Sequence, residues 1–301
     1  MASTTASYRA NSKLARTNND DLQTCLSSSL PLSIRTIYPC STLANQNSSQ
    51  YQCDHFNVNG LSSVRGGRIS HFPAVIVYAT DSNDVQNVVK CATKLNYIVN
   101  ARSGGHSYEG YSLGSMYNNI VINMEAINYI RINQYDGTGT FGAGARIGPI
   151  YYRTYQYNYT INAGSCAWMG LAGHALGGGL GIDGDSGDNQ QLLLDGLTYP
   201  TYYFKAKHLF YDGPISSHSL DKFIDRLASG DGQINMGFNS WDGYLSTIPA
   251  DETAFPHRHF KFGIQFTVYP NDEQHEQQQM NWLNQVRARR ADSEYLLFID
   301  F

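Results

Sequence analysis

The sequence of 301 residues lacks the marks of several protein classes. Charged residues make up only 15% of it, the net charge is −4, and no basic run is long enough for a nucleic-acid surface. No stretch of about 18 apolar residues occurs, so no membrane-spanning helix is predicted. We therefore expect neither a nucleic-acid partner nor a membrane.

The sequence also lacks a recognisable secretory signal, because residues 1–21 are polar and contain no apolar core. Either the protein stays inside the cell or its true start lies elsewhere. Two matches to the N-glycosylation sequon, Asn47-Ser48-Ser49 and Asn158-Tyr159-Thr160, would instead suit a secreted protein, although such short matches often arise by chance. The compartment stays undecided.

The cysteines follow no metal or redox motif. There are five, at positions 25, 40, 53, 91 and 166, and no pair has the CxxC spacing or a zinc-binding spacing with histidine. Because the count is odd, at least one cysteine lies outside any disulfide within the chain.

The abundant residues are hydrophobic and neutral polar ones. The hydrophobic fraction of 42% is enough for a sizeable core, and tyrosine occurs 22 times. This composition suits an extracellular or sugar-handling protein, but an AT-rich genome explains it equally well.

A strand–helix–strand unit is predicted over residues 74–101. The β-branched run 74–79 indicates a buried strand, and residues 81–84 supply capping groups for a helix over 84–95. Apolar residues at helical spacing support that helix, and 97–101 indicates the next strand. The unit ends directly in a glycine-rich segment.

That first glycine-rich segment can bind an anion. It consists of Arg102, Ser103, Gly104, Gly105, His106 and Ser107. Its glycines allow positive φ and close approach to a ligand, and its successive N–H groups can form a nest for a pyrophosphate. The two serines add donors, and His106 would lie beside the bound group. An ordinary tight loop between strands is the alternative.

A second glycine-rich stretch runs from Gly164 to Gly181 and contains Cys166. It has too few large side chains to fill a core, but its backbone can pack against a flat ring. A thiol held there could attack an electrophilic carbon of that ring. Taken alone, a buried and inert cysteine is the alternative.

The remaining chain predicts further elements. We expect strands at 119–124, 138–143 and 203–211, a helix from Gly148-Pro149 to about Tyr157, a helix marked by Leu220, Phe223, Ile224 and Leu227, and a Gln-rich helix at 272–290. Residues 259–269 alternate strictly, which predicts a strand with one buried face that includes Phe260.

Together the two glycine-rich segments resemble those of FAD-linked oxidases with a PCMH-type FAD-binding domain, in the berberine-bridge-enzyme-like branch that includes glucooligosaccharide oxidases. The resemblance rests on Arg102 to Gly110 and on Gly164 to Gly181. The segments Ser246 to Pro249 and Thr253 to Arg258 also resemble that family's substrate domain.

The resemblance implies FAD bound at both segments. His106 would bond to the flavin 8α-methyl carbon and Cys166 to flavin C6, so that FAD is held by two covalent bonds. Further cofactor contacts would come from Arg102, Ser103, Gly104, Gly105, Ser107, Gly110, Gly170, Gly173, His174 and Gly178. It also implies a disulfide between Cys25 and Cys91.

The implied fold is α+β, a PCMH-type FAD-binding fold of two subdomains followed by a partial antiparallel-sheet substrate domain. We expect an N-terminal segment at 1–68, an incomplete FAD-binding domain at 69–181, a linker at 182–201 and a partial substrate domain at 202–301. Compared with the family, the chain resembles an internally deleted and C-terminally truncated form. Missing strands would expose sheet edges and apolar faces, so we expect weak FAD binding or poor folding.

The implied function is oxidation of an alcohol or carbohydrate hydroxyl, with hydride transfer to FAD and reoxidation by O2. Partners would be a small-molecule or oligosaccharide substrate and O2, and we expect a monomer. The family is usually secreted. Met169 stands where the family often has a valine that influences oxygen access. No catalytic base can be named. The alternative is a non-catalytic remnant or a sugar-binding protein.

Three weaker patterns carry no functional prediction. Residues 142–148 have the wrong spacing for a dinucleotide fingerprint, and the acidic residues of 183–188 are misplaced for a calcium loop. His257 and His259 lack an evident third metal ligand.

Overall fold

The computed structural model describes residues 14–38, 73–108, 111–113, 119–179, 205–228, 234–240, 243–252, 255–269, 273–287 and 296–300. The chain divides into two compact units. The first contains Met1–Leu61, Ser70–Gly104 and Tyr111–Ala145, and the second contains Ser62–Ile69, Gly105–Gly110 and Arg146–Phe301. The predicted linker 182–201 lies outside the described residues, and the predicted domain boundaries stay predictions.

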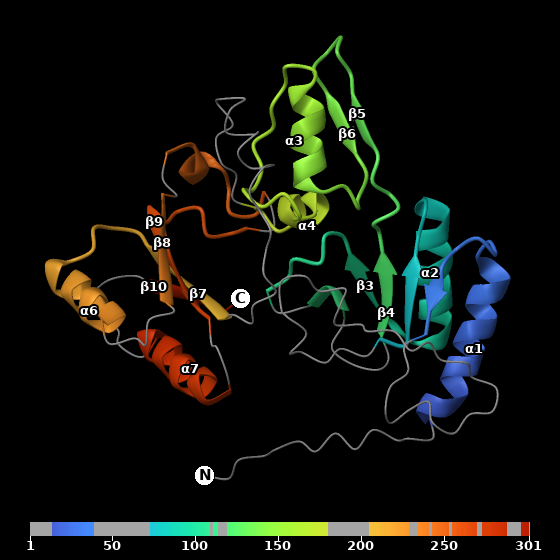
Figure 1. The fold of residues 1–301 in the computed structure, drawn as a ribbon, viewed down its shortest axis with the longest axis horizontal. Coiled ribbons are helices and arrows are strands. Elements are labelled where there is room, and N and C mark those ends of the chain that lie inside the picture. The colour runs from blue at the N-terminus through green and yellow to red at the C-terminus, as the bar shows by residue number, and fades with distance from the viewer. Residues whose placement is uncertain are drawn as a thin grey trace. The chain divides into compact units, whose positions relative to one another are not determined.

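The first unit is built on a four-stranded sheet. Its order is β1 (Thr36–Ile37), β2 (Val75–Tyr78), β4 (Asn119–Asn123) and β3 (Ile98–Arg102), with β2, β4 and β3 parallel and β1 antiparallel. Helices α1 (Leu14–Ser29) and α2 (Ser82–Leu95) lie beside the sheet (Figure 1). Their apolar side chains form one core with one face of the sheet.

Residues close in sequence determine where helix α2 begins and ends. The Asp81 side chain accepts hydrogen bonds from the N–H groups of Asn83 and Asp84, and Asn96 ends the helix in a left-handed conformation. Val88 and Ala92 are fully buried. The predicted helix at 84–95 and the strands at 74–79, 97–101 and 119–124 are confirmed.

A disulfide between Cys25 and Cys91 joins α1 to α2. The pairing that the family resemblance implied is thus confirmed. Because the bond closes a long segment of chain, it restricts the unfolded state and stabilises the packing of α1 on α2.

The first unit also contains the short helix η2 (Tyr111–Leu113) and an antiparallel pair, β5 (Ile130–Ile132) with β6 (Gly139–Phe141). Strand β6 confirms the strand predicted at 138–143. In the second unit, α3 (Ile147–Tyr155) begins two residues before Pro149 rather than at it. The missing N–H of proline is harmless there, because the first turn of a helix has no partner for its N–H groups.

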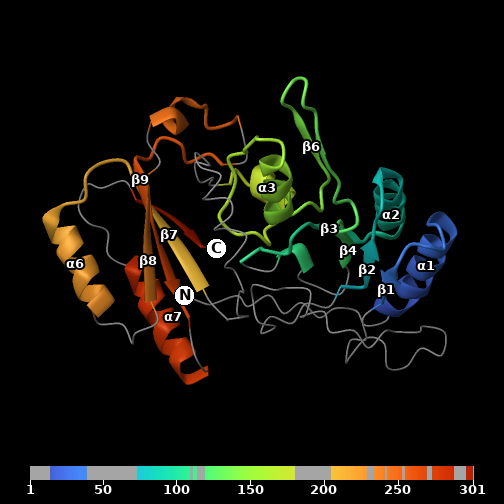
Figure 2. The ribbon, with the colours of Figure 1, turned by 45° about the horizontal axis from the view of Figure 1, so that its top comes forward.

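The second unit contains an antiparallel sheet in the order β10 (Leu296–Asp300), β7 (Lys205–Tyr211), β9 (Phe262–Val268) and β8 (Ile234–Ser240). Helix α7 (Glu273–Arg287) packs on one face through Trp282 and Leu283 (Figure 2). The unit also holds α4 (Leu171–Leu176), α6 (Ser217–Ala228) and η3 (Gly243–Thr247). The predicted strand at 203–211, the helix marked by Leu220 and the helix at 272–290 are confirmed.

The prediction for residues 259–269 is wrong in part. The strand begins at Phe262, and Phe260 lies before it and packs against Phe210. Ile264, Phe266 and Val268 do share the buried core with α7, but Thr267 on the opposite face is buried as well. Strict alternation predicts the strand, yet it cannot tell that both faces are covered.

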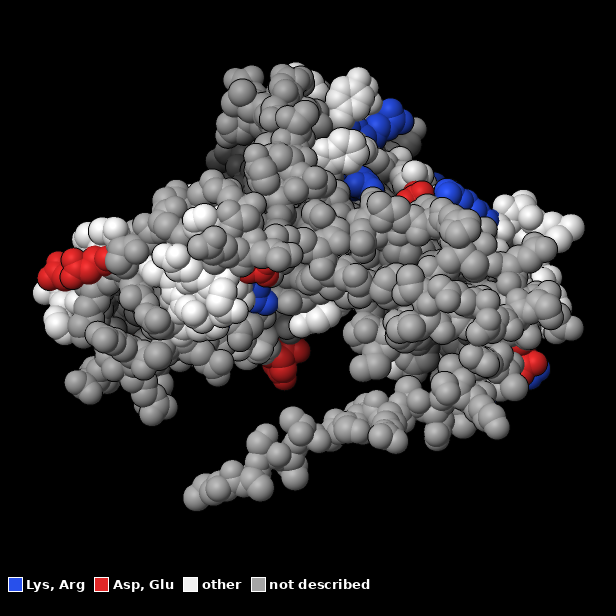
Figure 3. All heavy atoms as spheres, turned by 60° about the horizontal axis from the view of Figure 1, so that its bottom comes forward, with Lys and Arg blue, Asp and Glu red and all other residues white. Residues whose placement is uncertain are grey.

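Within the described residues, no helix has the length and apolar character needed to cross a membrane. On the face drawn in Figure 3, the acidic and basic side chains of the described residues are scattered. With helices packed on both four-stranded sheets, the chain has the α+β fold that the sequence predicts.

Candidate functional site

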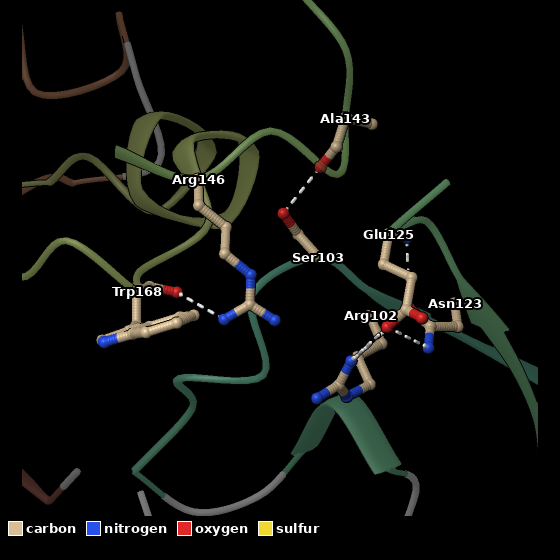
Figure 4. Close-up of polar contacts among 7 residues, drawn as sticks. All are labelled: Arg102, Ser103, Asn123, Glu125, Ala143, Arg146 and Trp168. Carbon is tan, nitrogen blue, oxygen red and sulfur yellow. Dashed lines mark hydrogen bonds and ion pairs between the residues drawn. The ribbon is translucent and has the colours of Figure 1, made fainter. Parts of the chain in front are cut away.

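Arg102, the last residue of β3, is 3% exposed and is held within the first unit. Its Nη1 donates a hydrogen bond to Asn123 Oδ1 at 3.4 Å and lies 3.9 Å from the Glu125 carboxylate (Figure 4). Asn123 in turn donates to Glu125 at 3.1 Å. A buried guanidinium needs such partners. Arg102 therefore fixes the ends of β3 and β4, where the first glycine-rich segment begins.

Ser103 ties the start of that segment to the turn after β6, because its hydroxyl donates to the carbonyl of Ala143 at 2.6 Å (Figure 4). The glycines of this turn have a packing role. A Cβ on Gly142 would collide with the carbonyl of Ile127, and one on Gly144 with the carbonyl of Met124. Close backbone approach thus accounts for the glycine pattern at 142–148.

The second unit holds the rest of the first segment, beginning with Gly105. Gly105 has φ 72, the conformation for which glycine was predicted. His106, Ser107 and Tyr108 are half-buried, whereas Gly110 lies outside the described residues.

His106 and Cys166 meet in this unit. The Nδ1 of His106 lies 3.9 Å from the Sγ of Cys166, although the residues are 60 positions apart, and Cys166 is a half-buried free thiol. At this distance the imidazole nitrogen and the thiol can share a hydrogen bond. Two nucleophilic side chains from distant parts of the sequence therefore lie side by side in the structure.

The loop that carries Cys166 is anchored to α3. The Tyr151 hydroxyl donates to the Gly164 carbonyl at 2.9 Å, and the N–H of Ile147 donates to the Met169 carbonyl at 2.9 Å. Arg146 donates to the Trp168 carbonyl at 3.2 Å and stacks over its ring (Figure 4). These contacts fix the loop on both sides of the thiol.

The second glycine-rich stretch wraps around His174. A Cβ at Gly179 would collide with the His174 ring, and one at Gly164 would lie 3.2 Å from it. Burial lowers the pKa of His174, so its imidazole is neutral at physiological pH. The sequence predicted that the backbone of this stretch packs against a flat ring. In the structure, the ring against which Gly164 and Gly179 pack is the imidazole of His174.

The other predicted glycines differ in their surroundings. Gly170 is buried and precedes α4. Gly178 has φ 85 and packs against Phe255, leaving no room for a Cβ. Gly173 is exposed, and a Cβ there would meet nothing within 4 Å. The surroundings of Gly173 therefore leave room for a ligand next to its backbone.

Tyr108 is a site residue to which the sequence assigned no role. Its side chain is hydrogen-bonded to that of Gln265 on β9, whose Nε2 donates to Thr267 Oγ1 at 3.1 Å. Burial raises the pKa of Tyr108, and nearby Tyr269 and Cys166 raise it further, while the bond to Gln265 acts in the opposite sense. Its phenol is therefore protonated and able to donate a hydrogen bond close to Cys166.

His257 and His259 lie among aromatic rings. The His257 ring meets Phe255 edge-on at 5.4 Å, and the His259 ring lies 4.0 Å from that of Phe260. Among the residues described, no group of three or more side chains could hold a metal ion.

Sequence comparison identifies an FAD binding domain over residues 73–198. An FAD-linked oxidoreductase of Bacillus subtilis, YgaK, is 35% identical over 114 residues, which cover 38% of this chain and 25% of the relative. Berberine bridge enzyme-like 16 of Arabidopsis thaliana is 35% identical over 127 residues, 41% of this chain and 24% of the relative. The chain thus matches about a quarter of the length of these relatives.

Solved structures show the same fold. Berberine bridge enzyme from Eschscholzia californica aligns with a TM-score of 0.72 at 16% identity, over 89% of this chain and 84% of that one. Berberine bridge enzyme-like 1 of Physcomitrella patens aligns with a TM-score of 0.71 at 20% identity, over 91% and 90%. Residues 73–198 therefore match an FAD binding domain, and the chain is similar in sequence and fold to berberine bridge enzyme-like FAD-linked oxidoreductases.

Proposed function

We propose that this chain binds FAD covalently through His106 and Cys166 and oxidises an alcohol or carbohydrate hydroxyl. The observation that carries the proposal is the distance of 3.9 Å between His106 Nδ1 and Cys166 Sγ, inside a chain with an FAD binding domain. Neither side chain is part of the hydrophobic core of the second unit, because both are half-buried.

The residues present fit a flavin. The free thiol of Cys166 and the imidazole of His106 are nucleophiles that can bond to electrophilic carbons of an isoalloxazine ring. The open surroundings of Gly173 leave room for a ligand, and neutral His174 can hydrogen-bond one. The predicted contacts at Arg102, Ser103, Gly104, Gly105, Ser107, Gly110, Gly170 and Gly178 complete the proposed set. Bound FAD would supply the hydride acceptor.

Tyr108 would bind the reacting hydroxyl. Its phenol is protonated, and Gln265 fixes its direction because the amide is itself held by Thr267. A phenol held in this way donates a hydrogen bond to the substrate oxygen and orients the carbon that loses hydride. Tyr108 is thus a binding group, and the acceptor of the hydroxyl proton stays unassigned.

The proposed partners are a small-molecule or oligosaccharide substrate and O2, and we propose that the protein acts as a monomer. Among the solved neighbours, berberine bridge enzyme was determined with (S)-reticuline, and a variant of Phl p 4 is described as a glucose oxidase. Both support a small molecule carrying hydroxyl groups. The substrate carbon would lose a hydride and the hydroxyl a proton, so that two electrons and two protons leave the substrate in all. O2 would be the final acceptor of both electrons and both protons, giving hydrogen peroxide.

The test uses the purified full chain. Its absorbance should show an oxidised flavin that bleaches under anaerobic conditions when an alcohol or oligosaccharide panel is added, and air should restore the colour with release of peroxide. Flavin absorbance that no member of the panel bleaches would argue against the proposed oxidation.

One observation favours the alternative, a non-catalytic remnant or a sugar-binding protein. Apolar side chains of the second unit are exposed to solvent, namely Leu220 and Ile224 on α6 and Phe238 on β8. Such exposure agrees with the expectation of weak FAD binding or poor folding. Sugar binding by calorimetry without flavin absorbance would favour this alternative.

A further inference from the structure

The turn that follows α3 presents an asparagine to solvent. Asn158 has φ 56, a left-handed conformation that asparagine tolerates better than most residues. Its N–H donates to the Tyr155 carbonyl at 3.0 Å, and the next N–H, of Tyr159, donates to the Thr154 carbonyl at 3.0 Å. The backbone of Asn158 is therefore fixed, while the residue itself is exposed.

This asparagine stands in a sequon, Asn158-Tyr159-Thr160. The middle residue is not proline, the third is threonine, and both Asn158 and Thr160 are exposed. A bulky glycan on Asn158 would therefore meet no buried side chain.

A separate observation bears on the compartment. The disulfide between Cys25 and Cys91 is a structural bond between two helices, and such bonds form and persist in oxidising compartments. In eukaryotic cells, the secretory pathway both oxidises cysteines and glycosylates sequons. The disulfide therefore supports the sequon as a site of modification.

The neighbouring tyrosines of α3 lack cover. Tyr155 is 51% exposed and Tyr152, one turn earlier, is 53% exposed. Tyr155 lies three residues before Asn158, and its carbonyl accepts the backbone N–H of Asn158 at 3.0 Å, so it is the tyrosine of α3 that lies closest to Asn158 in the sequence. The apolar face of a hexosamine ring can pack on an aromatic ring, which removes apolar surface of both from water.

We propose that Asn158 is N-glycosylated and that Tyr155 packs against the first sugar. The amide Nδ2 of Asn158 loses a proton and bonds to C1 of an N-acetylglucosamine. The bond between that C1 and the lipid-linked pyrophosphate of the oligosaccharide donor breaks, and the lipid pyrophosphate leaves. This inference is independent of the proposed FAD chemistry and stands or falls separately.

Translation of the full chain behind a cleavable signal sequence, in the presence of microsomes, tests the modification. Treatment with peptide N-glycosidase in H2(18)O should leave labelled aspartate at position 158. Asn158→Gln and Thr160→Ala should each abolish that label, Thr160→Ser should retain it, and Asn47→Gln should leave it unchanged. An unlabelled position 158, while a reporter sequon in the same reaction is modified, would overturn the proposal.

Thermal unfolding tests the contact with Tyr155. The glycosylated protein should unfold about 2 °C higher than the Asn158→Gln variant, a shift typical of one favourable contact in a chain of this size. Tyr155→Ala should remove this difference, whereas Tyr152→Ala should retain it. Equal differences in both variants would show that Tyr155 does not pack against the sugar.

Discussion

The Sγ of Cys166 lies 3.9 Å from the Nδ1 of His106, with the thiol on a loop that α3 anchors on both sides. The two residues reach the same place from glycine-rich segments 60 positions apart. A double attachment to one flavin ring requires two nucleophiles held near each other, and this pair meets that requirement.

Gly173 offers a test of ligand contact that is separate from protein stability. Because a Cβ there meets no protein atom within 4 Å, Gly173→Ala should leave the melting temperature unchanged or raise it, as alanine favours a helix. If FAD lies against Gly173, the same substitution should weaken reversible FAD binding about tenfold by titration calorimetry when it is made together with His106→Ala and Cys166→Ala, which prevent covalent attachment. Gly213→Ala is the control, since a Cβ there also meets nothing. Unchanged FAD affinity in Gly173→Ala would remove Gly173 from the site.

Tyr108→Phe removes one hydroxyl and keeps the ring. We expect kcat/KM to fall at least about tenfold, because the substrate oxygen loses its donor, while covalent flavin content stays the same. Steady-state kinetics and denaturing-gel flavin fluorescence measure the two quantities. Tyr111→Phe is the control, on an exposed tyrosine. A loss of flavin together with activity would mean that Tyr108 supports the fold rather than the substrate.

His208 should make the second unit sensitive to acid. It is 3% exposed, and burial lowers its pKa from 6.5 to about 4. Its contribution to stability is therefore complete above pH 6.5 and is lost as the pH falls towards 4, because only the unfolded state takes up the proton in that range. The loss should be on the order of 3 kcal/mol.

Urea unfolding at pH 7 and pH 4.5 measures this effect. His208→Phe, whose ring can keep the stacking on Phe210, should lose less stability than the wild type between these two pH values. His218→Gln, at an exposed position on α6, should behave as the wild type does. The idea fails if His208→Phe and the wild type lose the same amount.

Substitution of Met169 should change the rate at which O2 reoxidises the reduced flavin. Its side chain packs over Gly164 and beside the cluster of Ile147, Tyr151 and Ala163. Replacement by valine shortens the side chain and should open space near Cys166, so the photoreduced flavin of Met169→Val should reoxidise faster in air in a stopped-flow measurement. A slower or unchanged rate would show that this position does not control oxygen access here.

Local sequence patterns were sufficient to predict many of the helices and strands. The capping group at Asp81 and the apolar spacing of Val88 and Ala92 predict α2, because a helix depends on neighbours in sequence. The disulfide between Cys25 and Cys91 came from family resemblance, since spacing alone cannot pair cysteines.

Other features depend on tertiary contacts that cannot be predicted from local sequence patterns. Gln265 meets Tyr108 across more than 150 positions, and His208 is buried because β7 pairs with β9 and places it opposite Gln265. The packing of Gly178 on Phe255 likewise needs the tertiary fold. Sequence therefore predicted His106 and Cys166, which lie in recognisable segments, but not the groups on β7 and β9.

The most direct test of the account is mass spectrometry of tryptic peptides from the FAD-loaded full chain. We expect flavin to cross-link the peptides that contain His106 and Cys166, each single alanine variant to retain one attachment, and the double variant His106→Ala with Cys166→Ala to retain none. Covalent flavin that persists in the double variant, or wild-type peptides free of flavin at both residues, would contradict the account.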